Sequence, residues 1–178
     1  MFQVVAIGDA CSGKTSFIKR VSKDEFQVEH TPTIGSDMFC FPFRLGNFFV
    51  KLRVWDMPGM EKLRASTFAT TLRFGQGMLI FGDASDLLSL ESMAQHLMEA
   101  DRFCAEKCVR ILIINKIDSP HPEYETYKQN LAFLAKPSIP LYEVSVKNRI
   151  NMFEALGDLV ASMIWIKQTP DPVVELHS

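Results

Sequence analysis

Several features that would assign a chain to a functional class at once are missing from these 178 residues. Lys and Arg form no block, and the 19 basic residues are balanced by 21 acidic ones. Because binding to a nucleic-acid backbone depends on clustered positive charge, this balance argues against a nucleic-acid partner. Hydrophobic runs are short: stretches such as Val109–Ile114 are interrupted by charge well before the roughly 18 residues that a membrane-spanning helix needs.

Cysteine, histidine, glycine and proline are also scarce or scattered. The four cysteines are Cys11, Cys40, Cys104 and Cys108, and the four histidines are His30, His96, His121 and His177. None of these spacings is typical of a zinc site or a disulfide framework, so we interpret the cysteines as reduced core thiols of a cytosolic protein. Nine glycines and nine prolines are too few for a fibrous or disordered chain. The length suits one domain, which can bury about 70% of its unfolded surface.

Apolar runs alternate with segments of helical period, which predicts an α/β fold with a largely parallel sheet. The predicted strands are Phe2–Ile7, Asp37–Leu45, Phe48–Asp56, Met78–Asp83, Val109–Asn115 and Leu141–Val144. Gly46-Asn47 predicts a hairpin between the second and third. Apolar residues at helical spacing predict helices with one buried stripe at Leu87, Leu90, Ala94 and Leu97, and at Phe153, Leu156, Val160 and Met163.

A phosphate-binding pattern follows the first predicted strand. The segment GDACSGKT, residues 8–15, fits G-x-x-x-x-G-K-[ST] and leads into a helix. Gly8 and Gly13 allow backbone amides to turn inward around phosphate oxygens, and the helix N-terminus adds partial positive charge. Lys14 is predicted to reach the β- and γ-phosphates, and Thr15 to give its hydroxyl to Mg²⁺. The other predicted nucleotide contacts here are Asp9, Ala10, Cys11, Ser12 and Ser16.

The base of the bound nucleotide is predicted from a second motif, NKID at residues 115–118, which begins at the end of the fifth predicted strand. A carboxylate at Asp118 can accept hydrogen bonds from the ring N–H and the exocyclic amine of guanine, whereas adenine offers no such donor pair. Facing adenine, the unpaired carboxylate would lose roughly 1 to 3 kcal/mol or more. Ligands bind at the carboxyl ends of strands in such sheets, so Asn115 and Asp118 are predicted to select a guanine nucleotide.

Further segments extend the pattern between and after these motifs. TPTIG, residues 31–35, precedes WDMPG, residues 55–59, in which Asp56 is predicted to hold Mg²⁺ through a water molecule. EVSVK, residues 143–147, offers a turn of small residues that can close over the base. The order and spacing of these segments argue against chance loop sequence.

Together these motifs resemble those of the Ras superfamily of small GTPases, and IGSDM and RFGQGMLIFGDAS are similar to the Rab branch. The resemblance covers residues 1–168 and implies a three-layer P-loop G domain, α/β, with a six-stranded, mostly parallel sheet and helices on both faces. Residues 169–178, with Pro170 and Pro172, are expected to form a short flexible tail.

The resemblance also implies roles for individual residues. Thr33 would close on Mg²⁺ and the γ-phosphate as the switch I threonine, and the amide of Gly59 in switch II would contact the γ-phosphate. Phe26 would pack on the base, with a core aromatic as the competing interpretation. The guanine pocket would be completed by Lys116, Ser145, Val146 and Lys147. The implied cofactors are GTP or GDP and Mg²⁺, with Thr15, Thr33 and Asp56 as the metal-binding residues.

Catalysis is where the chain departs from the family. The residues expected to act on the γ-phosphate are Lys14, Thr33, Gly59 and Met60, and the family has a glutamine at the last of these positions to orient the attacking water. A thioether cannot position water for in-line attack, so slow GTP hydrolysis is expected.

Smaller departures concern recognition and membrane attachment. Met57 and Pro58 replace the usual Thr-Ala of switch II, and His30 replaces a tyrosine of switch I. Because no cysteine follows Cys108, no direct C-terminal lipid anchor is expected on this chain.

The expected function is a Rab-like, Mg²⁺-dependent molecular switch in vesicle trafficking, cytoplasmic and peripheral to intracellular membranes through its partners. The expected partners are an effector or complex subunit, bound through switch I, switch II and the strand Asp37–Leu45, an exchange factor and a GTPase-activating protein. One alternative is a G domain that binds GTP, scarcely hydrolyses it and serves as a scaffold or complex subunit, which Met60 favours. A P-loop kinase or ATPase is disfavoured by NKID.

The strand Asp37–Leu45 is apolar on both faces, which is unusual at a sheet edge. Alternation puts Phe39, Phe41 and Phe43 on one side and Met38, Cys40 and Pro42 on the other. One hypothesis makes this strand, with Trp55 and the switches, an apolar docking surface that uses Phe39 and Phe41. The competing hypothesis is that a helix covers the rings.

Overall fold

Six strands and five helices form in the part of the chain that the computed structural model describes, residues 1–26, 36–59, 65–134 and 139–169. In chain order they are β1 (Phe2–Gly8), α1 (Lys14–Lys23), β2 (Asp37–Leu45), β3 (Phe48–Asp56), α2 (Ala65–Phe74), β4 (Gly77–Asp83), α3 (Leu87–Phe103), β5 (Val109–Asn115), α4 (Tyr124–Leu134), β6 (Leu141–Glu143) and α5 (Met152–Gln168). Every predicted strand is present, with ends that agree to within one residue.

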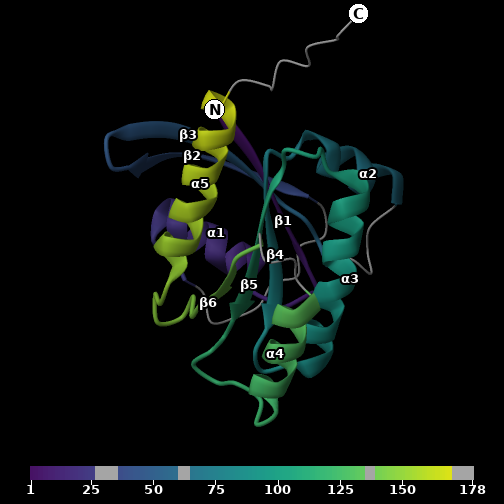
Figure 1. Ribbon diagram of the computed structural model, residues 1–178. Helices are drawn as coiled ribbons and strands as arrows, with labels where there is room; N and C mark the ends of the chain where they lie inside the picture. The colour runs from purple at the N-terminus through teal and green to yellow at the C-terminus, as the bar shows by residue number, and fades with distance from the viewer. Residues whose placement is uncertain (27–35, 60–64, 135–138, 170–178) are drawn as a thin grey trace, which may run out of the picture.

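The strands form one sheet in the order β2-β3-β1-β4-β5-β6. The hairpin pair β2–β3 is antiparallel and the other pairs are parallel. Helices α1 and α5 lie on one side of the sheet, and α2, α3 and α4 lie on the other (Figure 1). The predicted α/β fold with a six-stranded, mostly parallel sheet is confirmed.

Two hydrophobic clusters fill the spaces between the sheet and its two helical layers. One joins alternate residues of β1, such as Val4 and Ala6, to α1 and α5, and the other joins Val5 and Ile7 to α2, α3 and α4. Apart from Gln3, strand β1 is apolar, because both of its faces are covered, as is usual in a parallel sheet. This packing fixes the carboxyl ends of the central strands, where the predicted motifs lie.

The phenylalanine rings of β2 belong to the core. Phe41 is only 6% exposed, and the half-buried Phe39 and Phe43 pack against the cluster formed with α1 and α5. The opposite face is open to solvent, with Met38 50% exposed and Cys40 exposed. The docking hypothesis for Phe39 and Phe41 is therefore wrong, and the hypothesis of rings covered by helices is confirmed.

The buried stripes of α3 and α5 differ in detail from the prediction. In α3 the buried residues are Ser89, Leu90, Met93, His96, Leu97 and Ala100, whereas Leu87 and Ala94 are only half-buried. In α5, Met152 is buried and Phe153 is 51% exposed, because the stripe that faces the sheet runs from Met152 through Leu156.

Two of the four cysteines lie at the surface rather than in the core. The prediction of core thiols fails for Cys11 and Cys40, which are exposed. Among the residues described, no helix is long and apolar enough to cross a membrane.

Candidate nucleotide-binding site

The predicted motif residues gather at one edge of the sheet, where the parallel strands end. The phosphate loop connects β1 to α1, Asp56 is the last residue of β3, and Asn115 is the last residue of β5. Ser145 follows β6 on the same side. This arrangement follows from the topology, because ligands of such sheets bind outside the carboxyl ends of the strands.

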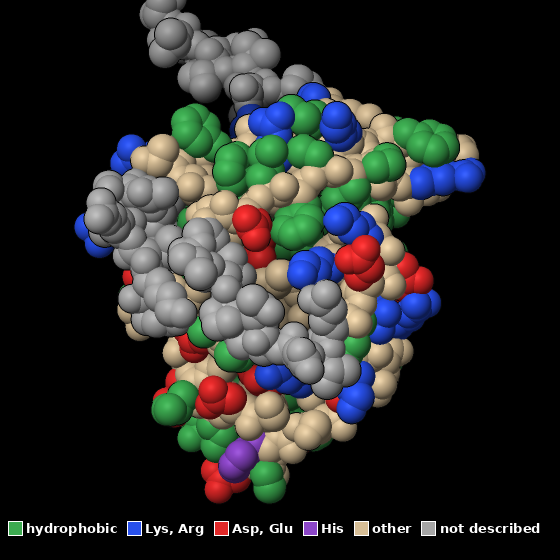
Figure 2. Space-filling view, turned by 180° about the vertical axis from the view of Figure 1, so that it is seen from behind, with side chains coloured by type: hydrophobic (Ala, Val, Ile, Leu, Met, Phe, Trp, Pro, Cys, Tyr) green, Lys and Arg blue, Asp and Glu red, His purple; other side chains and the backbone are tan. Residues whose placement is uncertain are grey.

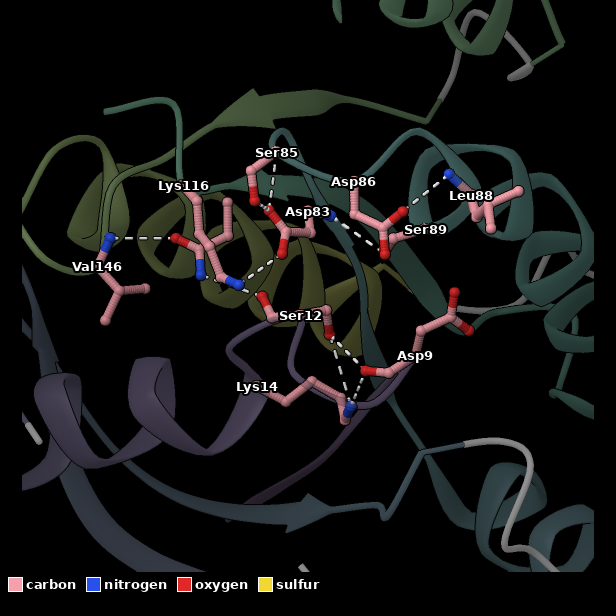
Figure 3. A network of polar contacts seen from close by, with 11 residues as sticks. Asp9, Ser12, Lys14, Asp83, Ser85, Asp86, Leu88, Ser89, Lys116 and Val146 are labelled. Carbon is pink, nitrogen blue, oxygen red and sulfur yellow. Dashed lines mark hydrogen bonds and ion pairs between the residues drawn. The ribbon is translucent and has the colours of Figure 1, made fainter. Parts of the chain in front are cut away.

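The phosphate loop is folded around the ammonium group of Lys14. The Nζ of Lys14 donates to the carbonyl oxygen of Gly8 at 3.0 Å. It also donates to the carbonyl oxygen of Asp9 at 2.7 Å (Figure 3). Gly13 precedes the first residue of α1, and among the described residues no side chain caps the start of this helix by a hydrogen bond. The amides at the start of α1 are thereby suited to an anion.

Glycine is required at both ends of this loop. Gly13 has φ 94°, and a Cβ there would lie 2.1 Å from Nδ2 of Asn115. At Gly8, with φ 143°, a Cβ would lie 2.4 Å from the carbonyl oxygen of Phe81. The motif glycines therefore bring the loop close to both β4 and the base-side segment.

Thr15 and Asp56 form the predicted metal-binding pair. The hydroxyl of Thr15 donates to Oδ2 of Asp56 at 2.5 Å, while Oδ1 of Asp56 is buried without a hydrogen-bond partner among the described residues. Burial raises the pKa of Asp56, although the bond from Thr15 and the charge of Lys14 act in the opposite direction.

A hard divalent cation fits this pair, because it takes oxygen ligands and because Mg²⁺ commonly uses only one or two protein ligands beside phosphate and water. A cation, or a water molecule bound to it, would also give the unpartnered oxygen of Asp56 a partner. Elsewhere in the described ranges, no group of three His, Cys, Asp or Glu side chains could hold a metal ion.

Asn115 joins the phosphate side of the site to the base side. Its Nδ2 donates to the carbonyl oxygen of Ser12 at 3.0 Å, and its Oδ1 accepts from the amide of Val146 at 3.1 Å. Both bonds are buried. The side-chain amide thus uses its donor and its acceptor to fix two loops, one 103 residues before Asn115 in sequence and the other 31 residues after it.

Asp118 is held at the base side by residues of the segment after β6. Its Oδ1 accepts from the hydroxyl of Ser145 at 2.5 Å, and Nζ of Lys147 lies 3.7 Å from its Oδ2. A carboxylate has further acceptor sites, so these contacts orient Asp118 while leaving it able to accept from a base.

Two contributors to the site were missed by the sequence interpretation. Asp83, the last residue of β4, has its Oδ2 2.5 Å from Nζ of Lys116 (Figure 3). Arg20, in α1, donates to the carbonyl oxygens of Val146 and Lys147 at 3.3 Å each. Asp83 could have been found from its place at a strand end, whereas no local signal distinguishes Arg20.

The remaining candidate residues differ in burial, and some of them lie outside the described residues. Phe26 is half-buried against the core, with the guanidinium of Arg20 5.0 Å from its ring centre, so both of its interpretations stay open. Gly59 is buried, Ala10 is exposed and Ser16 is half-buried. Thr33 and Met60, like His30, lie outside the described residues.

The fold and the site define a P-loop nucleotide-binding protein. A model of the Ras family matches residues 3–164, and the chain belongs to this family. It is a Rab-like small GTPase, as relatives in three lineages indicate. Ras-related protein Rab-1D of Dictyostelium discoideum is 30% identical over an alignment of 175 residues, with 96% of this chain and 85% of that protein covered.

Two further relatives support the same assignment. GTP-binding protein ypt1 of Schizosaccharomyces pombe is 32% identical over 155 residues, covering 87% of this chain and 76% of its own length. Ras-related protein RABD2c of Arabidopsis thaliana is 29% identical over 163 residues, covering 92% of this chain and 80% of its own length.

Proposed function

We propose that the protein is a Mg²⁺-dependent guanine-nucleotide switch of Rab type that acts in vesicle trafficking and hydrolyses GTP slowly. The observation that carries the proposal is the double hydrogen bond of Asn115, which ties the phosphate loop at Ser12 to the base-side segment at Val146. One nucleotide can then contact both segments at once, with its phosphates in the loop and its base beside Asp118.

Each residue has a role in this proposal that follows from its chemistry. Lys14 would exchange its carbonyl partners for β- and γ-phosphate oxygens, and Thr15 and Asp56 would hold Mg²⁺. When bound, the ion neutralises charge on the phosphates. Thr33 and Gly59 would contact the γ-phosphate, so that its loss releases the two switch segments.

Guanine selectivity is tested by Asp118→Asn. The amide can donate a hydrogen bond where the carboxylate only accepts, so this variant should lose affinity for GDP and gain affinity for xanthosine diphosphate. Competition titrations of both nucleotides against wild type and variant measure the exchange. Equal affinity of the wild-type protein for ADP and GDP would contradict the proposal.

A second candidate is a G domain that binds GTP without appreciable hydrolysis and serves as a scaffold or complex subunit. Met60, which replaces the glutamine that orients water, is the observation that favours it. A single-turnover assay of the GTP-loaded protein distinguishes the two, because the scaffold keeps its GTP and the slow switch converts it to GDP.

The partner surface that we propose combines the switch segments with the open face of β2. Met38 and Cys40 are exposed there, and the indole of Trp55, beside Met38 in the sheet register, is half-buried. The hairpin that continues this face carries hydrophobic and basic side chains (Figure 2). An effector, an exchange factor and an activating protein would use this side, and such partners would bring the protein to membranes.

A further inference from the structure

A buried histidine in α3 contacts the phosphate loop from outside the nucleotide-binding motifs. His96 is 3% exposed, an uncommon environment for an imidazole, and its Nε2 lies 2.8 Å from Oδ1 of Asp9. Asp9 is the first residue of the loop between β1 and α1. Because a carboxylate only accepts, Nε2 carries the hydrogen and donates it to Asp9.

The rest of the histidine ring gains little from polar contacts. Its Nδ1 is buried and has no hydrogen-bond partner in the described part of the chain. A buried polar atom without a partner costs free energy, which an apolar side chain at this position of α3 would avoid. The bond to Asp9 is therefore the feature of His96 that a packing role does not explain.

Asp9 transmits this contact to the phosphate loop. Its carbonyl oxygen accepts from Nζ of Lys14 at 2.7 Å and from the hydroxyl of Ser12 at 2.9 Å. These three residues lie together at the turn of the loop in Figure 3. The loop thus fixes the main chain of Asp9 and α3 fixes its side chain, so a displacement of Asp9 would shift the backbone of the loop that surrounds the phosphates.

We propose that His96 is a positioning residue that holds the phosphate loop in its nucleotide-binding shape by donating to Asp9, and thereby slows nucleotide release. This inference rests on the proposed guanine-nucleotide function and adds α3 to the elements that control it. The effect is on release rather than on the choice of base, because Asp9 lies in the phosphate loop while the base is read by Asp118.

The test measures the release of fluorescently labelled GDP from the purified protein in Mg²⁺, with unlabelled GDP as the chase. His96→Phe keeps a ring of similar size without a donor and should release GDP about tenfold faster, as expected for loss of one charge-assisted hydrogen bond. His96→Gln keeps an N–H donor and should restore most of the slow release.

The same bond can be removed from its other end. Asp9→Ala changes a partly exposed side chain and should accelerate release to a similar degree, which keeps the test decisive if His96→Phe does not fold. The double variant should release GDP no faster than the faster single variant, because both substitutions remove one interaction.

Leu97→Ala is the matched control, since Leu97 is the buried neighbour of His96 in α3 and packs in the apolar cluster. It should lower the melting temperature and leave the release rate unchanged. The inference would be overturned if His96→Phe and Asp9→Ala both released GDP at the wild-type rate. It would also be overturned if Leu97→Ala accelerated GDP release as much as they do. Wild-type protein that does not bind guanine nucleotide would instead overturn the proposed function, and this is seen before any variant is compared.

Discussion

Gly13→Ala is expected to destabilise the protein far more than an ordinary glycine substitution in a turn. The new Cβ would lie 2.1 Å from Nδ2 of Asn115, a separation that cannot persist, and the backbone at this position has φ 94°. Asn115 must therefore move, and its movement breaks the buried bonds to Ser12 and Val146.

The magnitude follows from these two effects. A residue with a side chain in the left-handed region costs about 1 kcal/mol, and each buried group left without its partner costs about 1–3 kcal/mol. With two such bonds lost, the expected decrease in the free energy of unfolding is about 4 kcal/mol. This is a large part of the roughly 5–15 kcal/mol that stabilises a protein of this size.

Gly46→Ala is the matched control. Gly46 has φ 55°, also in the left-handed region, but a Cβ there would have no atom of the described residues within 4 Å. Urea denaturation of the nucleotide-free protein should show a loss of about 1 kcal/mol for Gly46→Ala. Equal losses for the two variants would refute the reasoning, as would a Gly13→Ala effect that is undiminished when Asn115 has already been replaced by Ala.

Four further substitutions test the metal-binding pair, the predicted catalytic position and the two faces of β2. Burial raises the pKa of the Asp56 carboxyl above 3.8, its ordinary value. The folded state therefore loses stability as the pH rises from 3.8 through the raised pKa, and it remains less stable at pH 7 than at low pH because of this group. Asp56→Asn should therefore raise the melting temperature of the nucleotide-free protein at pH 7, by about 3 °C for about 1 kcal/mol, with a smaller gain near pH 4. Met60→Gln should accelerate single-turnover GTP hydrolysis about 100-fold, since one positioned polar group contributes about that factor. Phe41→Lys should cost more than about 3 kcal/mol in urea denaturation because Phe41 is buried, whereas Cys40→Lys on the open face should cost less than about 0.5 kcal/mol.

Each of these expectations can fail in a distinct way. A lower melting temperature for Asp56→Asn at pH 7 would show that the surroundings of Asp56 stabilise its charged form rather than destabilise it. Wild-type hydrolysis as fast as that of Met60→Gln would mean that another residue positions the water. If Phe41→Lys caused little loss in the free energy of unfolding, the ring of Phe41 would lie at the surface rather than in the core.

The phosphate loop and the strand ends could be predicted because their chemistry is local. A glycine-rich turn followed by Lys14 and Thr15 places amides, an ammonium group and a hydroxyl within eight residues, whatever the rest of the chain does. The central strands are largely apolar runs that end in polar motifs, so their ends could also be predicted to within one residue.

Contacts between distant residues could not be predicted in this way. Arg20 bonds to a carbonyl 126 residues away, His96 to a carboxylate 87 residues away and Lys116 to one 33 residues away. Each of these contacts depends on which face of a helix packs against which strand end, and the sequence pattern does not predict that packing.

The two faces of β2 show the same limit at the level of packing. Strand alternation placed Phe41 and Cys40 on opposite sides, and the structure agrees. Which side is covered depends on where α1 and α5 lie against the sheet, so the docking hypothesis chose the wrong rings.

The central claim, that this site binds a guanine nucleotide, is tested most directly by identifying the nucleotide that the purified wild-type protein retains in Mg²⁺. Chromatography of the nucleotide released by denaturation should give GDP or GTP in close to equimolar amount with the protein, and GDP, but not ADP, should exchange with it. Retention of an adenine nucleotide, or equal exchange of ADP and GDP, would contradict the account.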